Sequence, residues 1–146
     1  MSNDSPDFIC AKKFDILNAM PFITFPELSV TGYTCADLFF QTPLLHAAEQ
    51  AIQEIAEATK ALNIFLLIGA PIAVDNQMFN CAVALYRGKL LGIVPKTHIP
   101  NYSEFYEERW FASADDLLTE EITYAGQNVP IGADLIFAAA DFPALK

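Results

Sequence analysis

The clearest pattern along the chain is a helical one over residues 42–62. Apolar residues recur there every three or four positions, which places them on one face of a helix. These residues are Leu44, Ala48, Ala51, Ile55, Ala58 and Leu62. Thr42 offers a capping hydroxyl, Pro43 suits the first helical turn, and Asn63 tolerates the left-handed conformation at which helices end. The pattern predicts an amphipathic helix with one face packed on a core.

Short apolar runs on both sides of this helix predict buried strands. Residues 22–25 form a run that Pro26 cuts off, because proline cannot donate to a strand ladder. Residues 64–68 are apolar without alternation, as expected of a strand that is covered on both faces. A strand, a helix and a second buried strand make one βαβ unit, so the predicted fold class is α/β.

A hairpin is predicted after this unit. Residues 79–86 and 89–94 have the composition of strands, and Arg87-Gly88 between them is typical of a two-residue turn that contains glycine. A hairpin added to a βαβ unit makes the sheet mixed. Farther along, residues 121–142 are expected to form more short strands, one of them over residues 135–140.

Composition and charge narrow the class of protein. The 146 residues fit one domain, and a hydrophobic fraction of 53% indicates a globular chain. The formal net charge is −10 with only 8 Lys and Arg residues, which disfavours nucleic acid and anionic membranes as partners. The N-terminal sequence does not have the pattern of a signal peptide, and no apolar run is long enough to span a membrane. We therefore expect a soluble cytoplasmic protein.

Three cysteines, Cys10, Cys35 and Cys81, are expected to be free thiols of a reducing compartment, because their number is odd and their spacing irregular. Only His46 and His98 could join them in a zinc site, so no metal is expected. Cys81 lies within a predicted strand and is expected to be a core residue. Cys35 stands near a predicted helix start, where a thiol can become reactive, and is kept as an alternative.

Two charged residues stand where ligands collect in α/β folds. Glu27 and Lys96 each follow a predicted strand and an adjoining proline. Side chains leave a sheet at the carboxyl ends of its strands, so we expect these two to converge at one end of the sheet. Taken alone, the pair is also compatible with a salt bridge at the rim, which contributes about 0–1 kcal/mol.

An aromatic and charged segment follows Lys96. Residues 96–111 contain five aromatic residues among acidic ones, namely Tyr102, Phe105, Tyr106, Trp110 and Phe111. One interpretation is an aromatic cluster that packs a lid or an oligomer interface. The other is a pocket wall whose polar groups orient a substrate.

Two stretches carry a family resemblance: FPELSVTGY at residues 25–33 and PKTHIPNYSEFYEERWF at residues 95–111, with IGAPI and FNCAVALYRGKLLG between them. In these motifs the chain resembles the glutaminase domain of glutamine-dependent NAD synthetases, a branch of the nitrilase (CN hydrolase) superfamily. The resemblance implies half of a nitrilase-like α-β-β-α sandwich with a mixed sheet. It also implies a short leader over residues 1–20 and a partial domain, truncated at both ends, over residues 21–146.

The resemblance implies an activity and roles for the residues that match the family's motifs. The activity is hydrolysis of the glutamine side-chain amide through a cysteine thioester. Glu27 matches the general base, Lys96 matches the lysine that stabilises the tetrahedral intermediate, and Glu107 matches a supporting carboxylate. Tyr102 and Phe105 match aromatic positions that line the glutamine pocket.

The resemblance also implies partners. In the family, the ammonia passes to a synthetase domain that uses ATP and Mg²⁺, and the parent protein is expected to form a homo-oligomer. No cofactor is expected in this chain, since it has no P-loop or glycine-rich nucleotide motif. The family's nucleophilic cysteine follows a later strand, whereas no cysteine follows Cys81. The fragment is therefore expected to lack its nucleophile and to be inactive alone.

Two other functions stay open. Another amidase or carbamoylase of the nitrilase superfamily would share Glu27 and Lys96, although the aromatic residues Tyr102 and Phe105 favour glutamine. A non-catalytic interaction or oligomerisation module would use the aromatic segment as an interface. Substitution of Trp110 would disrupt such an interface, whereas substitution of Glu27 or Lys96 would not.

Overall fold

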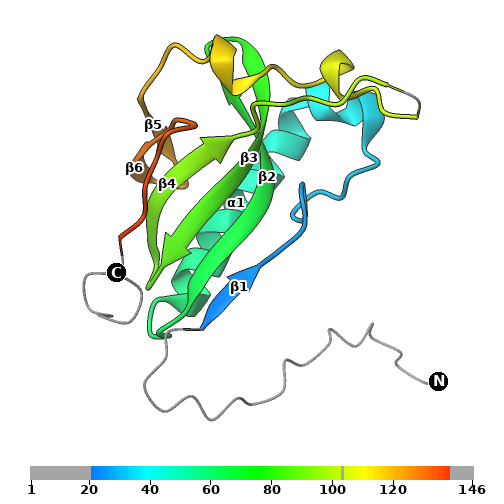
Figure 1. Cartoon of the computed structure of the whole chain (residues 1–146). Coiled ribbons are helices and arrows are strands. Elements are labelled where there is room, and N and C mark those ends of the chain that lie inside the picture. Colours follow the sequence, from blue (N-terminus) through cyan, green and yellow to red (C-terminus); the bar gives the residue numbers. More distant parts are fainter. Residues whose placement is uncertain (1–20, 103, 139–146) are drawn as a thin grey trace, which may run out of the picture.

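The computed structural model describes residues 21–102 and 104–138, and the leader predicted over residues 1–20 lies outside them (Figure 1). A four-stranded sheet in the order β1-β2-β3-β4 forms the centre, and α1 lies across one face of it. The elements are β1 (Phe22–Thr24), the 3-10 helix η1 (Ala36–Phe40), α1 (Thr42–Thr59), β2 (Phe65–Val74), β3 (Gln77–Tyr86), β4 (Lys89–Pro95), the 3-10 helices η2 (Glu107–Arg109) and η3 (Ala114–Asp116), β5 (Glu121–Tyr124) and β6 (Gln127–Pro130). This is the mixed α/β arrangement that the sequence predicts, although β1 is exposed rather than buried.

The strand directions bring three carboxyl ends to the same end of the sheet. β1 runs parallel to β2, with Phe22 paired to Phe65, and β3 is antiparallel to both β2 and β4. β1, β2 and β4 therefore point the same way, as Figure 1 shows. The segments that follow β1 and β4 consequently leave the sheet at one end.

Two tight turns connect the three long strands. Asp75 and Asn76 join β2 to β3, and Arg87 and Gly88 join β3 to β4. All four residues have positive φ, the conformation that matches a two-residue turn to the right-handed twist of its strands. The predicted hairpin turn at Arg87-Gly88 is thus confirmed.

β2 is longer than the predicted strand over residues 64–68, because it continues through Pro71 to Val74. Proline cannot donate to a ladder, which makes it rare within central strands. β1 pairs only with Phe65–Leu67, so the side of β2 that faces β1 has no ladder partner at Pro71. The missing N–H is therefore tolerated at this position.

The buried face of α1 is centred on Ala48, Ile52 and Ala56, of which only Ala48 belongs to the predicted set. Ala58 is exposed, and Leu62 lies beyond the end of the helix with 45% of its surface exposed. Ile52 is fully buried against the sheet, and its large side chain sets the rotation of the helix. Both ends also differ from the prediction: Gln41 precedes the helix without a side-chain cap, and the last helical residue is Thr59.

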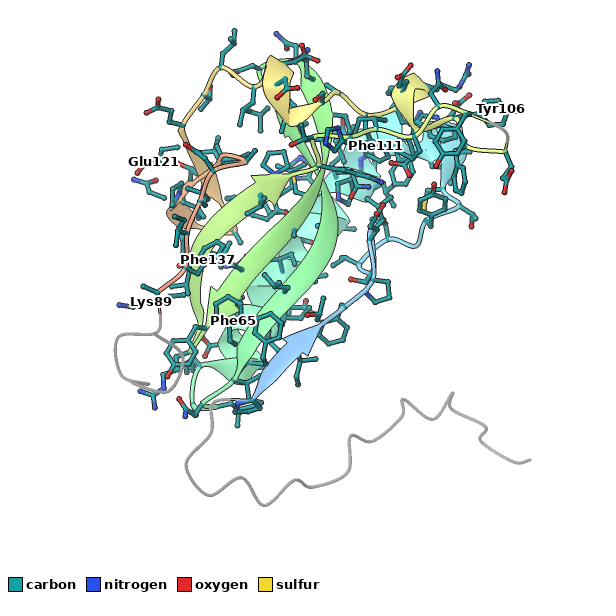
Figure 2. The ribbon with its side chains drawn as sticks, in the orientation of Figure 1. Phe65, Lys89, Tyr106, Phe111, Glu121 and Phe137 are labelled. Carbon is teal, nitrogen blue, oxygen red and sulfur yellow. The ribbon has the colours of Figure 1, made fainter. Side chains whose placement is uncertain are left out.

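The strand predicted over residues 135–140 does not form in its described part, which ends at residue 138. Leu135 and Phe137 instead lie against β4, where a Cβ added at Gly92 would come within 2.8 Å of Leu135 and 2.9 Å of Phe137. The Phe137 ring also meets the Phe65 ring at 6.0 Å (Figure 2). Side-chain packing on the sheet has replaced backbone pairing. The short strands predicted from residue 121 onward are present as β5 and β6.

Candidate active site

The segment that follows β1 lies tightly against β2 and carries Glu27. The N–H of Phe25 donates to the carbonyl of Leu67 at 2.9 Å, which continues the pairing past the end of β1. Leu28 then turns the chain, with a φ of 52° and a fully buried side chain. Leucine rarely adopts the left-handed conformation, and such local strain concentrates at functional sites. The buried Leu28 side chain anchors the turn from which Glu27 projects.

Gly69 in β2 allows this close approach. A Cβ at position 69 would lie 2.4 Å from both the carbonyl oxygen of Pro26 and the N–H nitrogen of Leu28. Ser29 adds a further tie, since its hydroxyl accepts a hydrogen bond of 3.2 Å from the Gly69 N–H. Only glycine fits between the two backbones, so Gly69 is part of what positions Glu27.

Lys96 leaves the same end of the sheet from β4 and meets Glu27 in space. The backbone N–H of Lys96 donates to the carbonyl of Asn80 at 2.8 Å, which extends the pairing of β4 with β3. The Lys96 ammonium nitrogen lies 3.1 Å from Oε1 and 3.0 Å from Oε2 of Glu27. The convergence that the sequence predicts for Glu27 and Lys96 is therefore observed.

Glu107 provides a second carboxylate to the same ammonium. Its Oε1 and Oε2 atoms lie 3.2 Å and 3.0 Å from the Lys96 nitrogen. The hydroxyl of Tyr33 donates to Oε1 at 2.7 Å. The side chain of Glu107 is 3% exposed, whereas that of Glu27 is 51% exposed. One carboxylate is thus held inside the protein and the other is open to an incoming group.

Glu27, Lys96 and Glu107 form a charged cluster. The pKa values of Lys96 and of the adjoining Tyr33 are shifted there. Burial of Lys96 acts to lower its pKa, but hydrogen bonds to Glu27 and Glu107 and the attraction of their charges raise it above the ordinary value. Burial and the hydrogen bond to Glu107 raise the pKa of Tyr33 to about 12. Near neutral pH, Lys96 is therefore a cation and Tyr33 a neutral hydrogen-bond donor.

Asn80 and Tyr33 are site residues that the sequence reasoning missed. The side-chain amide of Asn80, on β3, donates to Oε2 of Glu27 at 2.9 Å. Asn80 is a polar residue within an otherwise apolar strand, and Tyr33 ends the FPELSVTGY motif. These two signals were available, but neither pattern says which distant residue the side chain would reach.

A cavity of 230 Å³ lies beside Glu27 and Lys96. It is walled by the carboxyl ends of β1 and β4 and the facing parts of β2 and β3. Its lining is apolar apart from Thr24, Glu27, Asn80 and Lys96. A few polar groups on an apolar wall are typical of a small-molecule site.

The aromatic segment extends across this end of the molecule. Tyr102 and Phe105 contact each other with ring centroids 5.7 Å apart, and Tyr102 is 69% exposed. Figure 2 shows Phe111 over the end of the sheet and Tyr106 farther from the sheet, at the upper right. Tyr102 and Phe105 belong to the loop that leads into η2 and thus to Glu107, and within the described residues the ring of each packs against the other.

Contacts with η1 hold η2 in place. Arg109 donates two hydrogen bonds to the carboxylate of Asp37, at 2.8 Å and 2.9 Å, and the indole N–H of Trp110 adds a third at 3.0 Å. The rings of Phe39 and Phe111 pack with centroids 5.0 Å apart. Hydrogen bonds from Arg109 and Trp110 lower the pKa of Asp37 to about 2. These contacts between η1 and η2 fix the backbone on the C-terminal side of Glu107.

Neither described cysteine hydrogen-bonds to Glu27, Lys96 or Glu107, although Cys81 is among the residues that line the cavity. Cys81 is 2% exposed, and burial raises the pKa of its thiol, as expected of a core residue. Cys35 precedes η1, and its thiol contacts the carbonyl of Thr31 at 3.2 Å. Cys10 lies outside the described residues.

Within residues 21–102 and 104–138, no three His, Cys, Asp or Glu side chains are grouped as metal ligands would be. No helix in the same part of the chain has the length and apolar character needed to cross a membrane.

The fold and the site define the class of protein. A model of the carbon-nitrogen hydrolase family matches residues 11–137, and the chain belongs to this family. Among curated proteins it is similar to the glutamine-dependent NAD(+) synthetases of Mycobacterium tuberculosis, at 40% identity over 119 residues, and of Mycobacterium leprae, at 42% over 117 residues. These matches cover 82% and 80% of this chain, and 17% of the length of each relative.

A solved structure agrees with the sequence relatives. The crystal structure of a glutamine-dependent NAD(+) synthetase from Cytophaga hutchinsonii matches with a TM-score of 0.74 and 28% identity. That match covers 83% of this chain and 20% of the other. The family resemblance stated from the motifs is confirmed, and the chain spans about a fifth or less of the length of these relatives.

Proposed function

We propose that this site takes part in hydrolysis of the glutamine side-chain amide and supplies ammonia for NAD synthesis within a larger protein. The supporting observation is the Lys96 ammonium shared between an exposed and a buried carboxylate, in a chain of the carbon-nitrogen hydrolase family. The relatives with glutamine-dependent NAD synthetase in their names favour glutamine over other amides.

In this proposal Glu27 is the general base. A thiol is only a few per cent ionised near neutral pH and needs an adjacent base to become a nucleophile. Glu27 takes the thiol proton, and the sulfur bonds to the amide carbon while the carbonyl electrons move to oxygen. Collapse of this intermediate breaks the carbon–nitrogen bond, and ammonia leaves with the proton that Glu27 returns. Water then hydrolyses the thioester and releases glutamate.

Lys96 stabilises the oxyanion of the intermediate. Its raised pKa keeps it charged at neutral pH. A cation already held in place needs no reorganisation when negative charge develops beside it, which makes this one of the larger contributions to catalysis. Glu107 is the supporting carboxylate, because its buried position and its hydrogen bond from Tyr33 fix the far side of the ammonium.

Tyr102 and Phe105 form part of the glutamine pocket in this proposal. They lie on the loop that leads to Glu107. The exposed face of Tyr102 is available to a ligand. Substitution of either ring is expected to raise the KM for glutamine more than it lowers kcat.

The nucleophile is none of the cysteines in this chain. Cys81 is buried on the α1 side of the sheet, and the Cys35 thiol is held against the Thr31 carbonyl. The chain of residues 1–146 alone is accordingly proposed not to release ammonia from glutamine. Any ammonia release from glutamine by this chain contradicts this part of the proposal. Its loss when Cys10, Cys35 and Cys81 are replaced together by alanine would assign the nucleophile to one of them.

The remaining parts of the proposal concern the parent protein. Its synthetase domain, rather than residues 1–146, binds ATP and Mg²⁺ and receives the ammonia, and the parent forms a homo-oligomer. The test of substrate class compares initial rates of ammonia release from glutamine, simple aliphatic amides and carbamoyl compounds by the protein that the complete reading frame encodes. Glutamine is expected to give the highest kcat/KM. Preference for a simple amide or a carbamoyl compound assigns the protein to another amidase of the superfamily.

A further inference from the structure

Asn80 contacts both of the charged residues that converge at the end of the sheet. Its side-chain amide donates to Oε2 of Glu27 at 2.9 Å. Its backbone carbonyl accepts the N–H of Lys96 at 2.8 Å. A single residue of β3 therefore ties the side chain of Glu27 and the backbone of Lys96 to the sheet.

The burial of Asn80 is unusual for a residue within a strand. Asparagine is depleted in strands, and a buried amide is costly unless it is hydrogen-bonded. Asn80 is 3% exposed, and Asn80 and Glu107 are the buried polar or charged side chains among the described residues. Both contact the same charged cluster. Departures from local sequence preferences of this kind are expected at functional sites.

The hydrogen bond from Asn80 makes the two oxygens of Glu27 different. Oε2 accepts from the Asn80 amide and from Lys96, whereas Oε1 accepts from Lys96 at 3.1 Å. A carboxylate oxygen can accept more than one hydrogen bond, so Oε1 has the greater capacity left. The Glu27 side chain is 51% exposed, so an incoming group can reach this side chain from outside.

We propose that Asn80 is a positioning residue that orients Glu27, so that Oε1 is the oxygen that receives the proton of the reacting group. The identity of that group rests on the proposed function. The orientation itself rests on the three contacts of Glu27 and holds whether or not glutamine is the substrate. Asn80 acts through Glu27 and is not assigned a contact with the substrate.

Replacement of Asn80 by leucine separates this role from a purely structural one. Leucine branches at the same carbon as asparagine and suits the apolar wall around position 80, but it is larger and cannot donate. Water can replace the lost donor at Glu27, because this carboxylate is half exposed. Asn80→Leu is therefore expected to keep the thermal stability of the chain while it releases the Glu27 side chain.

The readout is the pKa of Lys96, followed by NMR of the carbon next to its ammonium in the 146-residue chain. Glu27, Glu107 and Tyr33 are the titratable groups that contact or adjoin this ammonium. Glu27→Gln is expected to lower the pKa of Lys96, and Asn80→Leu to lower it in the same direction. In the Glu27→Gln background, Asn80→Leu is expected to add no further shift, because the carboxylate that it positions is gone.

The measurement on Asn80→Leu has a matched control at Asn128. Asn128→Leu, at an exposed position of β6, is expected to leave the pKa of Lys96 unchanged. If Asn80→Leu does not fold, Asn80→Ala removes the same donor without adding bulk. An unchanged Lys96 pKa in the folded Asn80 variant, or the same shift with and without Glu27, overturns the proposal. Ammonia release is measured separately, so absent glutamine turnover refutes the proposed function and leaves the positioning result standing.

Discussion

The ammonium nitrogen of Lys96 lies 3.0 Å from Oε2 of Glu107, a carboxylate whose side chain is only 3% exposed. Lys96 comes from the end of β4, and Glu107 from η2 on the loop that crosses the end of the sheet. A buried carboxylate of this kind needs a cation and hydrogen-bond donors to offset its loss of hydration. The ion pair therefore joins the loop to the sheet as well as fixing Lys96.

Glu107→Gln tests this connection. Glutamine keeps the size of the side chain but removes the charge that faces Lys96, while Glu27 still neutralises the ammonium. We expect the free energy of unfolding to fall by about 1–3 kcal/mol, the usual effect of disturbing a buried charge-assisted hydrogen bond. Urea unfolding measures this change.

The matched control for this variant is Glu108→Gln. Glu108 is the next residue along the chain and is exposed, so its replacement is expected to change stability by less than about 0.5 kcal/mol. Equal effects at positions 107 and 108 would show that burial of Glu107 does not matter to the fold.

The ion pairs of Lys96 are expected to make the free energy of unfolding fall at alkaline pH. Its pKa is raised in the folded chain, so its contribution is fully present below the unfolded value of about 10.4 and is lost as the pH rises through the folded value. The raised pKa of Tyr33, about 12, adds a loss in an overlapping range. Lys96→Met isolates the lysine contribution, and the measurement is the urea midpoint as a function of pH.

In this experiment the wild-type chain is expected to lose more stability than Lys96→Met above about pH 10. Lys89→Met, at an exposed position in the same strand, is expected to follow the wild type. If the urea midpoint depends on pH in the same way in the wild type and in Lys96→Met, then Glu27 and Glu107 do not hold the ammonium in solution.

Gly69→Ala is expected to displace the segment that carries Glu27. The new Cβ would lie 2.4 Å from backbone atoms of Pro26 and Leu28, which cannot rotate away as a side chain can. We expect a loss of about 1–3 kcal/mol from overpacking, measured by urea unfolding. Gly132→Ala is the control, because the nearest atom there is a side-chain oxygen of Asp134 at 3.0 Å. If Gly69→Ala is as stable as Gly132→Ala, the backbone of Pro26 and Leu28 does not approach Gly69 as closely as described.

The contact of Asp37 with Arg109 and Trp110 is expected to break at acidic pH. Its pKa is lowered from 3.8 to about 2, so its contact with Arg109 and Trp110 is fully present above 3.8 and is lost as the pH falls through about 2. Trp110 is the single tryptophan of the chain, and its fluorescence reports on this contact. Asp37→Asn is expected to alter the emission near neutral pH and to remove the transition near pH 2. A transition that persists unchanged in Asp37→Asn assigns it to other carboxyl groups.

The sequence predicts the elements whose patterns are local. The helix at Thr42–Thr59 and the turn at Arg87 and Gly88 follow from side chains close to one another in the chain. The meeting of Glu27 and Lys96 also follows, because each comes after a strand and the strands share a direction. These predictions needed only the period of the pattern and the rules of strand connection.

Long-range packing is what the sequence pattern could not supply. Asn80 reaches Glu27 from 53 positions away, and Tyr33 reaches Glu107 from 74 positions away. The apolar run from residue 135 reads equally well as a strand or as a segment packed on β4, since the two differ only in their partners. For the same reason, the sequence pattern includes Ala48 in the buried face of α1 but not Ile52 and Ala56, whose burial depends on how the helix packs on the sheet.

The role of Glu27 as general base is tested by the rate of ammonia release from glutamine by Glu27→Gln in the protein that the complete reading frame encodes. Loss of the general base is expected to lower kcat by about 10²- to 10⁴-fold. Glu54→Gln makes the same change of charge at an exposed position of α1 and is expected to keep the wild-type rate. Ammonia release by Glu27→Gln at the wild-type rate would contradict the assignment of this site to amide hydrolysis.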